Sequence, residues 1–186
     1  MKKLGVKERI IEAASNLFYF EGYNQTGINK ILKEANVSKD SMYRYFRSKE
    51  DIAVAYLQGR HYMWMGNLTT FVEPNNTNKE KVIASFDYLY VWLKDVEFRG
   101  CGWQNIITDL PQDHDKIRHQ AVIHKNEFRE WIHELLEQDE QFKSEDVKSI
   151  GDQVLILLEG AIILSQIQKD SWPIDSAKQA CIKILN

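Results

Sequence analysis

The chain has 186 residues, of which 44% are hydrophobic and 27% are charged, and its net charge is −3 at neutral pH. This composition is that of a soluble globular protein. No purely apolar run reaches the roughly 18 residues that a membrane span needs, and no signal peptide is recognisable. Two distant cysteines, Cys101 and Cys181, exclude a disulfide framework. The sequence therefore predicts a cytoplasmic protein with no membrane partner.

The charge is unevenly distributed along the chain. Residues 1–60 contain 11 Lys and Arg against 7 Asp and Glu, whereas the rest of the chain contains 13 against 20. A basic head on an acidic body suggests that only the head meets a polyanion such as DNA.

Apolar residues recur at helical spacing, and no stretch shows the sustained alternation of a β-sheet. Pro74, Pro111 and Pro173 lie in polar contexts that are typical of breaks between helices. The predicted fold class is therefore all-α. The pattern predicts about nine helices, at 4–21, 28–35, 39–45, 49–72, 78–97, 102–109, 113–138, 144–169 and 174–185.

Three short helices occupy the first 46 residues, and small or polar residues mark the turns between them. Gly22 suits a left-handed C-cap of the first helix. Either Thr26 or Gly27 caps the second helix. Asn36 tolerates the left-handed conformation that the next tight turn requires, and Ser38 is a good N-cap for the third helix.

The third helix has one apolar side and one polar side. Met42 and Phe46 are neighbours at i,i+4 and are expected to fill the three-helix core together with Val37. An outward face with tyrosines and basic residues is suited to phosphates and base edges. We therefore predict a helix-turn-helix whose outward residues are Lys39, Asp40, Ser41, Tyr43, Arg44 and Tyr45.

The segment TGINKILKEANVSKDSMYRYFRSKEDI, residues 26–52, resembles the signature of the TetR family of bacterial transcriptional regulators. Asn36 stands where the family usually has glycine, and Gly27 where a hydroxyl residue is common. The resemblance implies an all-α homodimer that binds double-stranded operator DNA. A three-helix DNA-binding domain would occupy residues 1–48, and a larger helical ligand-binding and dimerisation domain residues 49–186.

Matching positions of the family signature imply a set of DNA contacts. Thr26 and Asn29 should lie close to the DNA backbone, and Lys49 should hold a phosphate from the start of the fourth helix. The complete implied set is Thr26, Asn29, Lys39, Asp40, Ser41, Tyr43, Arg44, Tyr45 and Lys49.

Aromatic residues are dense in the body of the chain. Trp and Tyr often line apolar ligand cavities, although ordinary core packing explains any single one of them. Glu159 lies in an otherwise apolar helix, where it could meet a polar ligand group or pair with a basic group across a dimer. We expect a small, largely apolar or aromatic effector to contact Trp64, Met65, Phe86, Tyr90, Trp103, Phe128 and Glu159.

The predicted helix at 144–169 is apolar all round in its middle, so it must be covered on more than one side. Gly151, Gly160 and Ala161 permit close approach of another helix. With the last helix, this one is expected to form a two-fold interface of four helices between the two copies of a homodimer.

Cys101 opens a second possibility. The segment RGCGWQN, residues 99–105, resembles the start of the sixth helix in one branch of the family, which includes repressors that sense electrophiles through a cysteine. A helix N-terminus and the neighbouring Arg99 favour a thiolate, and the flanking glycines would leave the sulfur open. The alternative is an inert cysteine buried beneath Trp103. Cys181 is expected to fill the interface.

No catalytic, cofactor or metal site is predicted. His114, His119 and His124 are five residues apart and do not share a helix face, and no zinc, nucleotide or hydrolase motif is present. The sequence thus predicts a dimeric, ligand-responsive repressor that an effector releases from a palindromic operator. The alternatives are a thiol-based repressor acting through Cys101 and, more remotely, a helical enzyme or an interaction protein with a vestigial helix-turn-helix.

Overall fold

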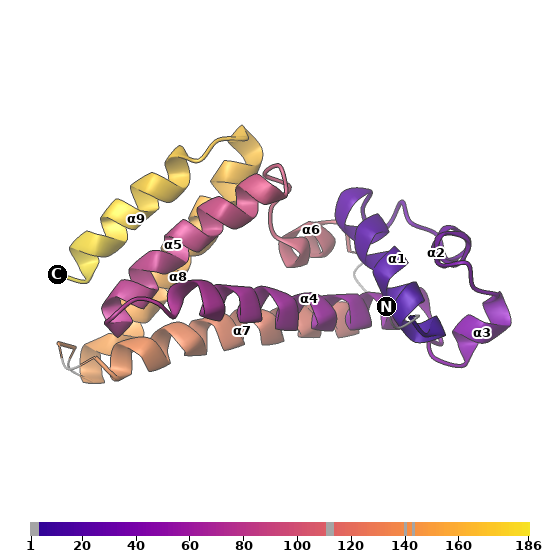
Figure 1. The fold of residues 1–186 in the computed structure, drawn as a ribbon, viewed down its shortest axis with the longest axis horizontal. Helices are drawn as coiled ribbons and strands as arrows, with labels where there is room; N and C mark the ends of the chain where they lie inside the picture. Colours follow the sequence, from indigo (N-terminus) through magenta and orange to yellow (C-terminus); the bar gives the residue numbers. More distant parts are fainter. Residues whose placement is uncertain (1–3, 111–113, 140, 143) are drawn as a thin grey trace. The chain divides into compact units, whose positions relative to one another are not determined.

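The computed structural model describes residues 4–110, 114–139, 141–142 and 144–186. Over these residues the chain is helical and contains no β-strand, in agreement with the all-α prediction (Figure 1). The helices are α1 (Val6–Phe20), α2 (Ile28–Ala35), α3 (Lys39–Tyr43), α4 (Lys49–Val72), α5 (Asn78–Asp95), α6 (Gly102–Thr108), α7 (Asp115–Glu137), α8 (Ser144–Gln168) and α9 (Trp172–Ile184).

All the predicted helices are confirmed within two residues at each end, and the differences at the end of α3 and the start of α9 are two residues each. Helix α3 ends at Tyr43, so Arg44 and Tyr45 follow the helix. Helix α9 begins at Trp172 because Pro173 lies in its first turn, where the missing N–H costs no helical hydrogen bond. Pro111 lies outside the described residues.

The caps of the first three helices follow the sequence closely. Gly22 has φ +98° just after α1, and Asn36 has φ 49° at the end of α2. Ser38 accepts a hydrogen bond from the backbone N–H of Ser41 at 3.2 Å. Gly27 is the N-cap of α2, whereas the Thr26 hydroxyl donates to the Gly22 carbonyl at 2.8 Å and closes the preceding turn.

The chain divides into two compact units, and the first comprises Met1–Tyr62 and Gly102–Ile123. In this unit α1 packs against α2, α3 and α6. The Phe18 ring lies in its core, 5.3 Å from the ring of Tyr23 and 5.9 Å from that of Tyr56. Segments from both halves of the sequence thus form one core around α1.

The second unit comprises Met63–Cys101 and His124–Asn186. Here α8 packs against α9, and α5 packs against both (Figure 1). Helix α5 begins with a capping box, in which Thr77 and Glu80 each bond the backbone of the other. These compact units do not follow the predicted domain boundary at residue 48, which stays a prediction.

One stretch in the described part of the chain, Asp146–Gln168, is long and apolar enough to cross a membrane by length and composition alone. The sequence had predicted no membrane span, because no purely apolar run in it is long enough. Core helices of soluble proteins pass the same test. Helix α8 packs against α5 and α9, and 33% of its most apolar window is buried within the described part of the chain.

Candidate DNA-binding surface and aromatic core

The face predicted to read DNA lies on α3 and the residues just after it. Met42 is completely buried and anchors the helix, while Tyr43 and Tyr45 are 48% and 52% exposed. The polar neighbours of these tyrosines are also exposed, except for the half-buried Ser41. We call this set the α3 face: Lys39, Asp40, Ser41, Tyr43, Arg44 and Tyr45. Large exposed aromatic side chains beside cations suit a phosphate backbone and base edges.

The two residues predicted at the start of α2 differ in exposure. Asn29 is exposed on the first turn of the helix. Thr26 is fully buried, and its hydroxyl donates to the Gly22 carbonyl. The resemblance would place the Thr26 side chain on the surface, but it is buried because its hydroxyl bonds the backbone of the turn.

Lys49 was predicted to be a phosphate contact, and the structure gives it an internal partner. Its ammonium donates to the Tyr23 carbonyl at 3.0 Å and lies 4.0 Å from the centre of the Tyr23 ring. Burial lowers the pKa of Lys49, and the carboxylate of Asp109 opposes this shift. Lys49 thus ties the start of α4 to the turn after α1.

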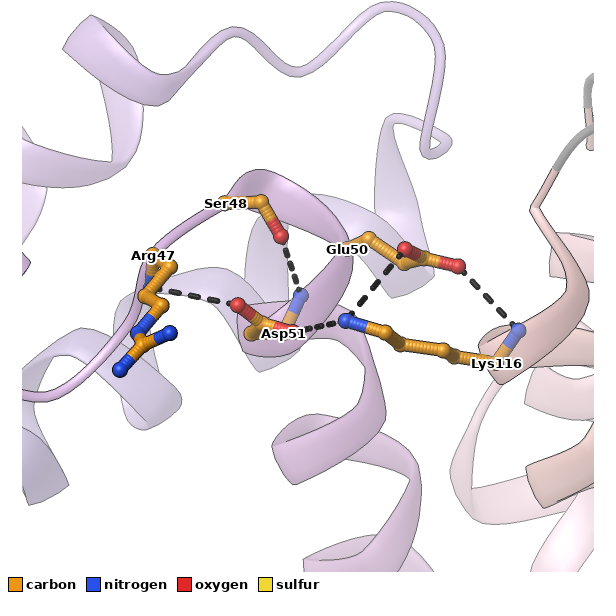
Figure 2. A network of polar contacts seen from close by, with 5 residues as sticks. All are labelled: Arg47, Ser48, Glu50, Asp51 and Lys116. Atoms are coloured by element: carbon orange, nitrogen blue, oxygen red, sulfur yellow. Dashed lines mark hydrogen bonds and ion pairs between the residues drawn. The ribbon is translucent and has the colours of Figure 1, made fainter.

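A polar network fixes the starts of α4 and α7 within the first unit (Figure 2). Ser48 accepts from the N–H of Asp51 at 3.1 Å, and Asp51 accepts from the N–H of Arg47 at 3.2 Å. The Lys116 ammonium lies 2.9 Å from Asp51, while its backbone N–H donates to Glu50 at 3.2 Å. The hydrogen bond from Lys116 lowers the pKa of Asp51. Residues 47–51, which follow the α3 face, are therefore bonded to one another and to Lys116 at the start of α7.

The turn after α1 is also held from the end of α6. The backbone N–H of Asn24 donates to the Asp109 carboxylate at 2.7 Å. The Asn24 side-chain amide donates to the other carboxylate oxygen at 3.0 Å and to the Asp109 carbonyl. We call these contacts the Asn24–Asp109 clasp. They join residues that are 85 positions apart in the sequence.

In the second unit, Trp64 is the centre of an aromatic core. The centre of its ring lies 5.0 Å from that of Phe128 and 5.5 Å from those of Tyr88 and His124. Trp92 is a fourth neighbour, at 5.7 Å. The Trp64 indole N–H is buried and has no acceptor among the described residues. Because an unsatisfied buried donor is costly, this N–H is available to a polar atom of a ligand.

The other residues predicted to contact an effector do not all join this core. Phe86 is fully buried in α5, and Met65 is half-buried. Tyr90 is 38% exposed, and its hydroxyl and ring lie near Lys94, so it points to the surface. Trp103 is buried in α6, which belongs to the other unit.

Glu159 has a basic partner within the same chain. The Lys125 ammonium lies 2.6 Å from Glu159 Oε1 and 3.6 Å from Cys101 Sγ. Burial disfavours the charge on Lys125, but Cys101 and Glu159 together outweigh it and raise the pKa of Lys125. The cation beside the sulfur is thus Lys125, which the sequence interpretation did not consider.

The environment of Cys101 also corrects an expectation. The flanking glycines do not leave the sulfur open, because Cys101 is only 2% exposed. Gly100 has φ +84°, and the Gln166 side chain occupies the space that a Cβ would need there. Cys101 is therefore buried, with the Lys125 ammonium beside its sulfur.

Two sequence models match the chain. The model of bacterial regulatory proteins of the tetR family matches residues 10–56. The model of the C-terminal domain of LmrA/YxaF-like transcriptional regulators matches residues 80–180, more than half of the chain. The chain belongs to the TetR family of bacterial transcriptional regulators. Members of this family bind operator DNA and function as homodimers with small-molecule effectors.

Relatives of known sequence or structure agree with the TetR assignment. LmrA of Bacillus subtilis, an HTH-type transcriptional regulator, is 26% identical over 178 residues that cover 90% of each chain. The crystal structure of SCO4454, a TetR-family regulator from Streptomyces coelicolor, has a TM-score of 0.85 at 23% identity and covers 97% of this chain and 88% of its own.

A structure of Escherichia coli NemR in its reduced form has a TM-score of 0.82 at 21% identity and covers 97% of both chains. The relatives and the fold are those of TetR transcriptional regulators and not of enzymes, which confirms the prediction that the chain is not an enzyme.

Proposed function

We propose that this TetR-family protein is a cytoplasmic, dimeric repressor that binds a palindromic operator and is released by a small effector. The observation that carries the proposal is the α3 face, where exposed tyrosines and cations surround a helix fixed by the buried Met42. With Asn29, this face supplies phosphate contacts and base-edge contacts from one short segment.

A dimer is required because two recognition helices must reach successive major grooves, about 34 Å apart. We propose that α8 and α9 form the interface. An apolar groove of about 230 Å³ runs between these helices and includes Gly160, Leu164 and Trp172 among its lining residues. Ile156 and Ile167 are each 70% exposed on α8, an exposure that a second copy would remove.

The effector is proposed to bind at the aromatic core around Trp64. Aromatic rings supply apolar contact area, and the buried indole N–H can orient one polar atom of the effector. Helix α4 contains both Trp64 and Lys49, so effector binding can bias the position of the DNA-binding segment. A coupling free energy of about 1–3 kcal/mol is typical of such a switch.

The proposal is tested by the binding of the purified protein to the DNA directly upstream of its own gene. Tyr43→Ala should weaken this binding at least tenfold without changing the helical content or the dimer. Lys148→Ala, which removes an exposed cation on α8, should leave binding unchanged. Wild-type affinity in Tyr43→Ala would remove the α3 face from the DNA interface.

Cys101 favours a second candidate function, that of a thiol-based, electrophile-sensing repressor. The Lys125 ammonium lies 3.6 Å from the sulfur, so a cation is in contact with the candidate sensing group. The burial of Cys101 argues against fast access by reagents. In this reading, alkylation would disturb the contact among Cys101, Lys125 and Glu159, and operator binding would fall after modification.

A further inference from the structure

Arg60, in the middle of α4, is a half-buried cation with an unusual environment. Its guanidinium carbon lies 3.8 Å from the centre of the Tyr19 ring. Its Nε is buried and has no hydrogen-bond partner in the described parts of the chain. Within the described residues, the contact with the Tyr19 ring is the only interaction found for the Arg60 guanidinium.

Several other half-buried cations in the described part of the chain have oxygen acceptors. The Arg9 guanidinium donates to the carbonyls at the end of α2, and the Lys125 ammonium pairs with Glu159. The remaining half-buried cations with described oxygen acceptors are Lys49, Lys79, Lys81 and Lys178. Arg60 therefore differs from cations that merely brace the fold.

An exposed arginine would satisfy its five donors with water, but burial removes part of that hydration. Stacking on a tyrosine ring compensates for only part of the loss, because the ring offers no acceptor in the plane of the guanidinium. Such a group is favoured when a ligand supplies the missing oxygens. A carboxylate or a phosphate fits the planar fork with two parallel hydrogen bonds.

Gly102, at the start of α6, lies next to Arg60. A Cβ built on Gly102 would lie 2.7 Å from Arg60 Nε and 2.7 Å from the Tyr56 hydroxyl. The absence of a side chain at Gly102 thus lets both polar groups converge on its backbone. Tyr19, Tyr56, Arg60 and Gly102 belong to the first compact unit, so one unit contains the complete constellation.

We propose that Arg60 is the anchor for an anionic group, a carboxylate in the first instance, of a small molecule that binds beside Tyr56 and Gly102. The guanidinium donates to the two carboxylate oxygens, and the Tyr19 ring stacks against the face of the guanidinium. This inference goes beyond the proposed function, because it adds an acidic ligand at a site in the first unit, whereas the effector site proposed around Trp64 lies in the second unit. Binding at Gly102 would act directly on α6, which ends at the Asn24–Asp109 clasp.

The test measures the thermal unfolding of the purified full-length dimer with three probes at constant ionic strength. The probes are benzoate, its uncharged isostere benzamide, and inorganic phosphate, with chloride as the baseline. Benzoate should raise the Tm of the wild type by about 2–4 °C near saturation, and benzamide should not. A response to phosphate alone would identify a phosphate site and overturn the carboxylate assignment.

Three variants assign the effect to Arg60. Arg60→Met keeps the length of the side chain and should abolish the benzoate shift. Gly102→Ala should do the same, because its methyl group fills the space where Nε and the hydroxyl converge. Arg118→Met, which removes an exposed cation of the same unit, should respond like the wild type.

An equal shift in the wild type and in Arg60→Met, or no shift with any anion in the wild type, would overturn the proposal. Circular dichroism of each variant confirms that it is folded before its response is compared. The readout does not involve DNA. Failure of the wild type to bind the upstream DNA would instead contradict the repressor proposal, so the two failures are distinguishable.

Discussion

The carboxylate of Asp109 accepts both the backbone N–H and the side-chain amide of Asn24. The end of α6 is thereby attached to the turn between α1 and α2, in the same compact unit as the α3 face. Lys49 contacts the same turn through the Tyr23 carbonyl. A change in the position of α6 would therefore reach the DNA-binding helices through side chains that are already in contact.

The first prediction concerns this clasp. Asp109→Ala removes both acceptors and should lower the Tm by about 2–4 °C, since a hydrogen bond to a charged group contributes roughly 1.5–3 kcal/mol before exposure reduces it. Asn24→Ala keeps the bond of the backbone N–H and should lower the Tm less. Amide exchange at Asn24 should become faster in Asp109→Ala alone. Equal exchange in both variants would argue against the backbone contact.

The second prediction separates two roles of Lys49. Lys49→Met keeps a long apolar side chain but removes the ammonium from both the Tyr23 carbonyl and the Tyr23 ring. We expect a Tm about 2–4 °C below that of the wild type. If Lys49 also holds a phosphate, the slope of log affinity against log salt should fall by about 0.9. A variant with the wild-type Tm would show that the ammonium does not stabilise the turn.

The third prediction concerns the dimer. Ile156→Asp places a charge on the exposed apolar surface of α8 and should convert the dimer to a monomer in analytical ultracentrifugation, because the carboxylate would be buried in the proposed interface. The matched control is Val91→Asp, which alters a residue that is 51% exposed on α5 of the same unit. Dissociation by both variants, or by neither, would contradict an interface through α8 and α9.

The fourth prediction compares the two cysteines. Burial raises the pKa of Cys181 to about 12, so its thiol should be inert at neutral pH and serves as an internal control. Iodoacetamide should modify Cys101 faster than Cys181 in the native dimer, and Lys125→Met should slow the reaction at Cys101. If the two cysteines react at the same rate, or if modified protein binds the operator normally, the thiol-sensing candidate fails.

The fifth prediction concerns pH. Hydrogen bonds from Arg129, and also from His133, lower the pKa of Asp152 from 3.8 to about 2. The contribution of Asp152 to stability is therefore present above about pH 4 and is lost as the pH falls to about 2. Exposure of this ion pair limits the contribution to about 1 kcal/mol.

Thermal melts of Asp152→Asn against the wild type measure this contribution. The variant should unfold about 2–4 °C lower at pH 7. The difference between the two melting temperatures should shrink as the pH falls from 4 to 2. A constant difference across this range would show that the Asp152 charge does not account for it.

The sequence predicted the DNA-binding segment well because its determinants are local. The cap at Ser38 and the left-handed turn at Asn36 involve neighbours within five residues. The spacing of Met42 and Phe46 was enough to assign the inward side of the third helix, and both are buried. Patterns of this range can be read from a single sequence.

The contacts missed from the sequence join residues far apart in the chain. Lys125 and Glu159 are separated by 34 positions, and Asn24 and Asp109 by 85. No periodicity connects such pairs, because their contact depends on how the helices pack. Thr26 is a different case, because its hydroxyl bonds the nearby Gly22 carbonyl although the family signature implied a position near DNA.

The first compact unit is built from two separate parts of the chain, and this has a practical consequence for engineering. A chimera that joins a foreign DNA-binding head at residue 48 would leave α6 and the start of α7 with the recipient chain. Asp109 would then face a foreign turn at Asn24, whereas Lys116 would keep Glu50 and Asp51 of its own chain. Grafts that carry both residues 1–62 and residues 102–123 from the donor should preserve all of these contacts.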